Sequence, residues 1–207
     1  MPTPVTFGGA SAHAFGFGVV AAGKPSLWSW GRGIYGELGL GNTTNYSSPK
    51  QVGSLTTWSS VAGGGYHTIA VKTDGTLWTW GSNFVGQLGI GNTTYYSRPK
   101  QVGSLSTWLT LTAGYKFSFG IKTDGTLWSW GQGDAGRLGL GNQTYYSSPK
   151  QIGALTGWLS ISAGRYSSLA LRTDGTAWSW GSNQYGQLGL GNTTNYSSPK
   201  QIGSSAT

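Results

Sequence analysis

Short runs of alternating apolar and polar residues, separated by Gly, Asn and Asp, fill the chain. In the second quarter, Trp58–Ala62 and His67–Lys72 are rich in β-branched and aromatic residues, and Thr73–Thr76 contains the Asp-Gly signal of a two-residue hairpin. Leu77–Trp80 follows, and a period of two places both of its tryptophans on one face. Pro99–Val102 indicates a short outer strand, because proline is tolerated at a sheet edge. We predict four strands in this segment.

This arrangement recurs along the chain with a period of 50 residues. The stretch Leu-Trp-Ser-Trp-Gly at 27–31 returns with small changes at 77–81, 127–131 and 177–181. The stretch Gly-x-Leu-Gly-x-Gly-Asn occurs at 36–42, 86–92, 136–142 and 186–192. Four short antiparallel strands at such a period are typical of propeller blades. We predict an all-β chain that forms one repeat domain over residues 1–207, with blades at 4–53, 54–103, 104–153 and 154–203.

The first copy is complete in this alignment but differs from the others in its hairpin. Val5–Gly9 aligns with Ser59–Gly63, and His13–Phe17 aligns with His67–Val71. The alignment requires an insertion of four residues around 18–26, where the Asp-Gly hairpin is missing. We therefore expect each blade to contain four strands of its own.

The composition adds little reactive chemistry to this scaffold. The 207 residues include 37 Gly, 11 Trp and 11 Tyr but no Cys, which excludes a disulfide framework, a thiolate zinc site and a cysteine nucleophile. Five Asp and Glu and two His form no triad, acid pair or metal-binding pattern, so we predict no enzyme and no cofactor. No apolar run reaches the length of a membrane span, and the first residues lack a signal-peptide pattern. The net charge of +8 favours acidic partners, although the basic residues are scattered.

Three motifs resemble the RCC1-type repeat, the unit of the propeller family named after the regulator of chromosome condensation. They are Trp-Gly-x4-Gly-Gln-Leu-Gly at 80–89, Pro-Lys-Gln-Val at 99–102 and Gly-Gly-x-x-His-Thr at 63–68. The resemblance covers essentially the whole chain and implies a β-propeller. It specifies function weakly, because the family includes nucleotide-exchange factors, regulators with RCC1-like domains, and bacterial and bacteriophage repeat proteins. The low content of charged residues and the amino-acid sequence of the repeats look most like those of the bacterial and bacteriophage repeat proteins.

The number of repeats departs from the family, whose rings normally close with seven blades. Trp178, Trp180, Leu188 and Leu190 of the fourth copy match the inner copies, so no polar cap is visible. Exposed apolar faces at both ends would favour closure through burial. We predict that two chains pair into an eight-bladed ring with isologous symmetry. A wider four-bladed monomer, an open arc capped by another protein and a higher assembly are the alternatives.

The tryptophans have a structural explanation in most copies. The strand pairs are predicted to pack between blades, at positions 28/30, 78/80, 128/130 and 178/180. Three further tryptophans each begin a strand, a position at which a partly exposed role is more plausible than for the strand pairs: Trp58, Trp108 and Trp158.

Other conspicuous residues also fit turns. Gly31–Gly36 and Gly131–Gly136 match G-x-G-x-x-G, but no helix is predicted after them, and the middle residue, Gly or Asn, indicates a left-handed turn. Glu37 aligns with Gln87, Arg137 and Gln187, and we expect an exposed polar position. Asp74, Asp124 and Asp174 belong to Asp-Gly hairpins. His13 and His67 align with Phe117 and Ser167, so no histidine site is shared among the blades.

The candidate binding surface consists of the loops that precede the outer strands, together with one lysine of each outer strand. The tyrosines of these loops lie among Asn, Ser and Thr, a mixture suited to adaptable recognition of glycans or proteins. The lysine recurs in every blade and has two possible roles. We favour the first, in which it protects an edge strand against aggregation. In the second, the lysines form a circle of positive charge that binds a polyanion. The candidate residues are Tyr46, Tyr95, Tyr96, Tyr145, Tyr146, Tyr196, Lys50, Lys100, Lys150 and Lys200.

These observations favour a non-enzymatic, self-assembling propeller that acts as a structural, adhesion or protein-interaction module. Its expected partners are a second copy, another structural protein or a surface glycan, and we expect no membrane insertion and no nucleic-acid partner. A virion or extracellular surface is the favoured setting, with the cytoplasm as the alternative. The competing functions are a lectin-like propeller and an RCC1-type guanine-nucleotide exchange or regulatory protein. Glycan binding would support the lectin, and release of nucleotide from a small GTPase would support the exchange factor.

Overall fold

The computed structural model describes residues 4–5, 15–20, 26–54 and 57–203, which form four antiparallel sheets of four strands each. This confirms the predicted all-β architecture. The first sheet contains β1 (Pro4–Val5), β2 (Phe15–Val20), β3 (Ser26–Gly31) and β4 (Tyr46–Gln51). The second contains β5 (Trp58–Gly63), β6 (His67–Lys72), β7 (Leu77–Gly81) and β8 (Tyr96–Gln101). The third contains β9 (Trp108–Ala113), β10 (Phe117–Lys122), β11 (Leu127–Gly131) and β12 (Tyr146–Gln151), and the fourth contains β13 (Trp158–Ala163), β14 (Ser167–Arg172), β15 (Ala177–Gly181) and β16 (Tyr196–Gln201).

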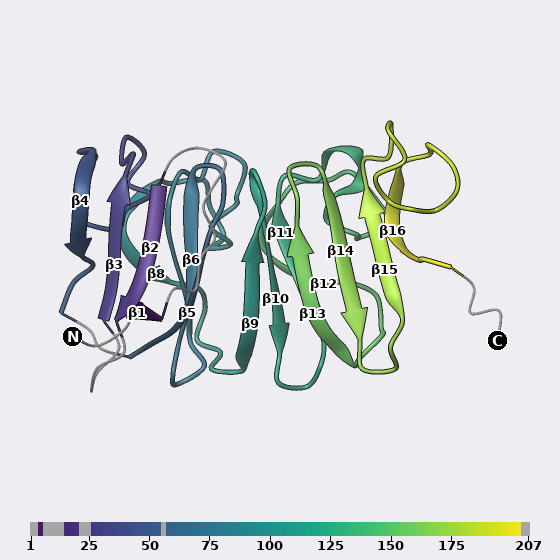
Figure 1. Cartoon of the computed structure of the whole chain (residues 1–207), viewed down its shortest axis with the longest axis horizontal. Coiled ribbons are helices and arrows are strands. Elements are labelled where there is room, and N and C mark those ends of the chain that lie inside the picture. The colour runs from purple at the N-terminus through teal and green to yellow at the C-terminus, as the bar shows by residue number, and fades with distance from the viewer. Residues whose placement is uncertain (1–3, 6–14, 21–25, 55–56, 204–207) are drawn as a thin grey trace.

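The sheets follow one another in space as they do along the chain. Within each sheet, neighbouring strands are consecutive in sequence, and the outer strand is reached through a long loop, such as residues 82–95 between β7 and β8. β6 packs against β9, and β10 packs against β13, which places each sheet on the next one. The first and fourth sheets stand at opposite ends of the molecule (Figure 1). The chain therefore forms an open arc of four blades and not a closed four-bladed ring.

The Asp-Gly hairpins form with the predicted turn chemistry. Gly75, between β6 and β7, has a φ of 77°, in the left-handed region that glycine favours. The Asp74 Oδ1 accepts hydrogen bonds from the backbone N and the Oγ1 of Thr76 at 3.0 and 2.6 Å. These bonds lower the pKa of the Asp74 carboxyl, and the same pattern recurs in the hairpins of the third and fourth sheets.

The register of the first sheet differs from the sequence alignment. Phe15 pairs with Gly31 as His67 pairs with Gly81, so Phe15 and not His13 is equivalent to His67. His13 itself lies outside the described residues. The extra length of this hairpin is two residues and not four, because Phe15 and Gly31 are 16 positions apart whereas His67 and Gly81 are 14 apart. A displacement of two residues keeps every side chain on its face, so the alternation of apolar and polar residues cannot detect it.

The core lies between neighbouring sheets and is built around tryptophans. The second tryptophan of each strand pair is fully buried in three copies, as predicted: Trp80, Trp130 and Trp180. The expectation of partial exposure for the tryptophans that begin strands is wrong, since 1%, 4% and 3% of the surface is exposed for Trp58, Trp108 and Trp158. The Trp58 ring centroid lies 5.8 Å from that of Trp80 in edge-to-face geometry, and this packing, repeated in the other sheets, keeps the strand start out of solvent.

Each blade interface holds one tryptophan in a socket of the preceding sheet. The Trp80 Nε1 donates to the Glu37 carbonyl at 2.9 Å, and a Cβ on Gly39 would lie 2.8 Å from the same nitrogen, so only glycine leaves room for the indole. The two later interfaces repeat this hydrogen bond at 3.0 Å, from Trp130 to Gln87 and from Trp180 to Arg137. The socket is therefore a repeated structural unit with a defined occupant.

The residue that supplies the socket carbonyl is buried, contrary to the exposed polar position expected for Glu37. Glu37 and Gln87 have no exposed surface, and Arg137 is 5% exposed. The Glu37 side chain turns back into its own loop, where its carboxylate accepts from the backbone N of Tyr35 at 2.7 Å and pairs with Arg32 at 3.0 Å. Capping of the turn explains why a polar side chain occupies this position in every copy.

The G-x-G-x-x-G segments have a structural role, but not through the expected left-handed turn. Neither Gly33 nor Asn83 has a positive φ. A Cβ on Gly33 would collide with the Thr44 carbonyl. In the second blade, the Asn83 Nδ2 instead donates to the carbonyls of Asn92 and Thr94 at 2.8 and 3.0 Å. This position therefore holds a long loop in place, through close backbone approach at Gly33 and through side-chain hydrogen bonds at Asn83.

Candidate interaction surfaces

The fourth sheet presents a tryptophan socket that no described tryptophan fills. The pocket has a volume of 270 Å³, and its walls include Ser168, Leu169, Gln187, Leu188, Gly189 and Ile202. A Cβ on Gly189 would meet nothing nearer than the Ile202 side chain at 3.8 Å, whereas Gly139 faces the Trp180 indole. We call this pocket the terminal socket.

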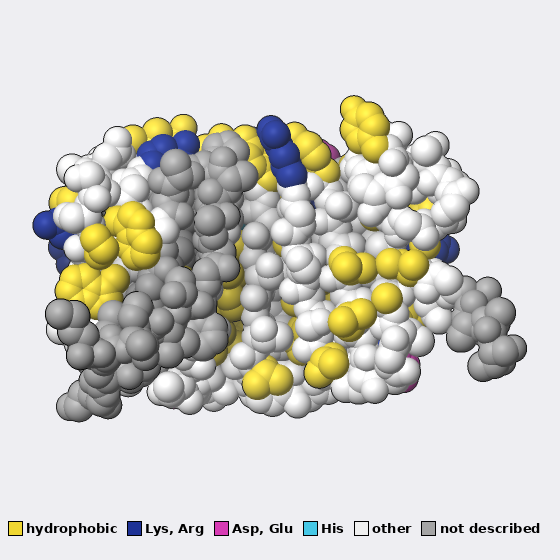
Figure 2. Space-filling view, viewed as in Figure 1, with side chains coloured by type: hydrophobic (Ala, Val, Ile, Leu, Met, Phe, Trp, Pro, Cys, Tyr) yellow, Lys and Arg dark blue, Asp and Glu magenta, His cyan; other side chains and the backbone are white. Residues whose placement is uncertain are grey.

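The wall of the terminal socket is an apolar face that the inner blades bury. Leu169 and Leu171 are 45% and 42% exposed, whereas their counterparts in the second and third sheets are at most 2% exposed: Ile69, Val71, Phe119 and Ile121. Figure 2 shows hydrophobic side chains gathered on the surface over β13 and β14. The fourth sheet therefore ends the arc with a face of the same kind as a blade interface.

A continuous row of aromatic and cationic side chains crosses all four blades at one rim. Tyr35 packs edge-on against Tyr66 at 5.4 Å between ring centroids, and the hydroxyls of Tyr66 and Tyr115 are 2.8 Å apart. The Arg165 guanidinium lies 4.8 Å from the Tyr115 ring centroid and 5.1 Å from that of Tyr166. Hydrophobic and basic side chains gather along the upper edge in Figure 2, over the loops that join β9 to β10 and β13 to β14. We call these residues, with Arg32, Phe84, Tyr95 and Lys116, the tyrosine–cation row.

The charges of the row are mostly positive and accessible. Arg32 is paired with the buried Glu37, but Lys116 and Arg165 form no ion pair within the described ranges. Lys116 lies 4.4 Å from the Phe84 ring centroid, and such cation–π contacts hold a side chain in place without neutralising its charge. The hydrogen bond to Tyr115 raises the pKa of Tyr66, so its phenol stays neutral at physiological pH. The row offers rings, hydroxyls and cations together.

The structure separates the predicted binding residues into two groups. Four tyrosines begin outer strands and are half-buried beneath the lysine of the same strand, with Nζ 5.4–5.8 Å from the ring centroid: Tyr46 with Lys50, Tyr96 with Lys100, Tyr146 with Lys150 and Tyr196 with Lys200. Of the other two, Tyr95 belongs to the row and Tyr145 does not. Tyr95 packs 6.1 Å from Tyr35, and the Tyr145 hydroxyl donates to Asp134 at 2.6 Å, which raises the pKa of Tyr145. Binding by either group stays a prediction.

The centre of the row was not predicted from the sequence. Tyr66, Tyr115 and Arg165 lie in the short loops before β6, β10 and β14, where the repeat motif varies from copy to copy. The available signal is an aromatic or basic residue just after a glycine in three copies, at 65–66, 114–116 and 164–166. Only the fold reveals that these loops lie on the same rim as the loop of Tyr35.

The described residues of the two surfaces include no set of side chains that could bind a metal ion. No group of three His, Cys, Asp or Glu side chains that could hold an ion occurs in the ranges that the structure describes. Those ranges also contain no helix of sufficient length and apolarity to span a bilayer.

Repeated four-stranded sheets, each socketed onto the next, define a β-propeller built from sequence repeats. The chain belongs to the regulator of chromosome condensation (RCC1) repeat family, whose model matches residues 26–71, 74–121, 124–171 and 174–207. A second model of the same repeat matches 58–87, 110–137 and 158–187. This confirms the resemblance that the sequence motifs indicate.

Solved propellers share this fold. Prp20p from Saccharomyces cerevisiae matches with a TM-score of 0.81 and 24% identity, over 94% of this chain and 49% of its own. Human WBSCR16 matches with a TM-score of 0.81 and 23% identity, over 92% of this chain and 51% of its own. The chain thus spans about half the length of these proteins.

Proposed function

We propose that this chain is a protein-interaction propeller of which two copies pair into an eight-bladed ring, and that the ring binds a protein partner through the tyrosine–cation row. The terminal socket carries the proposal, because the same socket holds a tryptophan in all three internal interfaces. An exposed apolar face of this kind is rare on a soluble monomer. Burial of a Leu side chain contributes about 1.5–3 kcal/mol, so a copy seated on Leu169 and Leu171 gains stability.

The occupant that fits the socket is Trp30 of a second copy. Trp30 is the first-blade counterpart of Trp80, is partly exposed, and its Nε1 forms no hydrogen bond to a described residue. Its natural acceptor would be the Gln187 carbonyl, at the position where Glu37, Gln87 and Arg137 accept. The two end faces differ, so a two-fold ring closes through two identical head-to-tail contacts in place of the isologous contact expected from sequence. Two chains also match the length of the relatives, of which one chain spans about half.

In light scattering we expect the 207-residue chain to have about twice its mass of 21.7 kDa. Leu169→Asp places a charge in the socket wall, and Trp30→Ala removes the occupant, so each variant should be monomeric. Leu159→Asp is the matched control, because Leu159 is 60% exposed like its counterpart Leu109 inside the arc, and its variant should remain dimeric.

Mixing the two disruptive variants tests the direction of the contact. The Trp30→Ala copy keeps an intact socket, and the Leu169→Asp copy keeps an intact tryptophan, so head-to-tail pairing predicts that the mixture regains one contact and a two-chain mass. A wild-type chain that stays monomeric at high concentration, or a dimer that Trp30→Ala leaves unchanged, contradicts the proposed assembly.

For the tyrosine–cation row we propose a protein partner with an acidic segment. Lys116 and Arg165 supply charge, and the adjoining rings supply contact area with a small entropic loss. The relatives support the class of partner: Prp20p is described with its binding properties to Gsp1p and histones, and yeast RCC1 has been crystallised with Kap60 bound. A structural or adhesion role, in a virion or at another surface, would use the end faces for assembly and the row for attachment.

Selection from a random displayed-peptide library tests the row. We expect enrichment of acidic peptides whose affinity falls at least tenfold in the double variant Lys116→Ala/Arg165→Ala, since two accessible cations are lost. The same charge change on outer strands, Lys150→Ala/Lys200→Ala, is the control and should leave binding unchanged. Selected peptides without acidic residues, or equal binding by both double variants, contradict the proposal. Specific glycan binding that the row variant abolishes would favour the lectin alternative.

A further inference from the structure

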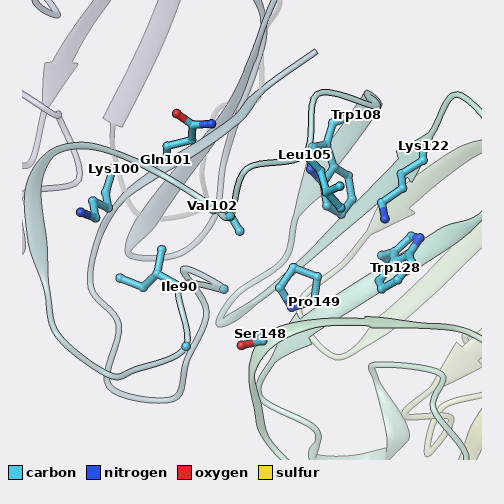
Figure 3. Close-up of a pocket in the computed structure, with 13 residues that line it drawn as sticks. Ile90, Lys100, Gln101, Val102, Leu105, Trp108, Lys122, Trp128, Ser148 and Pro149 are labelled. Carbon is cyan, nitrogen blue, oxygen red and sulfur yellow. The ribbon is translucent and has the colours of Figure 1, made fainter.

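A cavity of about 360 Å³ opens between the second and third sheets, away from the tyrosine–cation row. Its walls are mainly apolar, from Ile90, Val102, Leu105, Trp108, Trp128 and Pro149. Figure 3 shows these side chains around the cavity, with Lys122 directed at Trp128. This volume and lining are typical of sites for small organic ligands, in which a few polar groups fix the orientation of an apolar body.

The distinctive polar group of the cavity is Lys122. This residue is only 7% exposed, and its Nζ lies 3.6 Å from the Trp128 ring centroid and 5.1 Å from that of Trp108. The lining contains no carboxylate, and Lys122 has no ion pair within the described ranges. The ammonium rests on two indole faces with no direct ion pair, and burial of a charge is costly. Desolvation lowers the pKa of Lys122, and the charge of Asp124 only partly offsets this effect.

In the other two blade interfaces, either the cation that corresponds to Lys122 is paired with a carboxylate or an arginine covers the corresponding region. Between the third and fourth sheets the cavity is smaller, 210 Å³, and the corresponding cation, Arg172, is paired with Asp174 at 2.6 Å. Between the first and second sheets, the Arg98 guanidinium lies over Gly41. Ser148 stands at the position of Arg98 in the next repeat and leaves the cavity beside Lys122 uncovered.

We propose that this cavity binds a small organic carboxylate with an aromatic or branched aliphatic body. The carboxylate pairs with the Lys122 ammonium, and the apolar body packs against Trp108, Leu105 and Pro149. Lys100, which also lines the cavity, adds a second positive charge at its edge.

Calorimetric titration with N-acetyl-L-phenylalanine tests the site, with N-acetyl-L-phenylalaninamide as an uncharged probe of the same body. We expect the acid to bind with a millimolar or lower Kd and at least tenfold more tightly than the amide. Lys122→Met keeps an unbranched apolar stem on Trp128 but removes the charge, so it should weaken the acid at least tenfold and leave the amide unchanged.

Two matched variants place the binding in this cavity. Lys72→Met removes the equivalent lysine, whose Nζ lies 3.6 Å from the Trp78 ring centroid, and should have no effect because Arg98 covers that interface. Ser148→Arg copies Arg98 and should abolish binding, whereas Ser198→Arg in the next interface should not. Absence of binding by the acid, equal affinity for acid and amide, or an unchanged affinity in folded Lys122→Met or Ser148→Arg protein overturns the proposal.

Discussion

Replacement of Trp130 by alanine should lower the free energy of unfolding by about 3–5 kcal/mol, the range measured for large-to-small changes of buried aromatic residues. Trp130 has no exposed surface, and its indole fills the socket of the second sheet while donating to the Gln87 carbonyl at 3.0 Å. The variant loses the apolar contact with both sheets and leaves a cavity at the interface. Urea denaturation followed by far-UV circular dichroism measures the change.

Trp128→Ala is the matched control for Trp130→Ala, because it makes the same chemical change two residues away on the same strand. Trp128 is only partly buried and bonds to Thr126 of its own sheet at 2.8 Å, so its loss should be clearly smaller. Equal losses in the two variants, or a loss below about 1 kcal/mol for Trp130→Ala, would show that the socket does not hold the blades together.

The parts of the fold that repeat were predictable from sequence. The Asp-Gly signal located the hairpin at Gly75, and the period of two placed Trp78 and Trp80 on one face, because both depend on local chemistry that each copy displays anew. The burial of Trp58 was not predictable in this way. A strand start is an ambiguous position, and the ring of Trp58 packs against Trp78 and Trp80 of β7, which lies beyond β6 in the same sheet.

The polar core positions were missed for a different physical reason. Glu37 has the sequence appearance of a surface residue, yet its carboxylate is enclosed by its own turn, with Arg32 and the Tyr35 backbone as partners. Such a position is recognised only when the hydrogen-bond partners are known, since a buried charge is stable only when paired. The tyrosine–cation row escaped notice because Tyr35, Tyr66 and Tyr115 come from different blades and meet only through the fold.

Acidification from pH 6.5 to pH 4 should destabilise the protein through His67. This residue has no exposed surface, and burial lowers its pKa from 6.5 to about 3. Between these values the unfolded chain binds a proton that the folded protein does not, so stability is complete above pH 6.5 and falls as the pH decreases toward 3. The slope approaches about 1.4 kcal/mol per pH unit, which gives a loss of about 3 kcal/mol by pH 4.

The hydrogen bonds of His67 explain why the ring stays neutral. The Ser118 hydroxyl donates to the Gln87 carbonyl at 2.9 Å, so its oxygen accepts from the Nε2–H of His67 at 2.8 Å. The Nδ1 is buried and has no hydrogen-bond partner among the described residues. A proton on Nδ1 would therefore create a buried charge without a partner, which the folded state avoids.

His67→Phe supplies the matched variant, because Phe117 occupies the equivalent position in the third sheet and is fully buried there. The unfolding free energy of the variant should change by less than about 1 kcal/mol between pH 6.5 and pH 4, while that of the wild type falls by about 3 kcal/mol. The hairpin aspartates do not obscure this window: their pKa values are lowered from 3.8, so their contribution is lost only as the pH falls below about 4. His13 is common to both proteins, and its effect cancels in the difference. Parallel pH profiles for the two proteins would mean that His67 becomes protonated within the folded state, and the conclusion that its buried ring stays neutral would then be wrong.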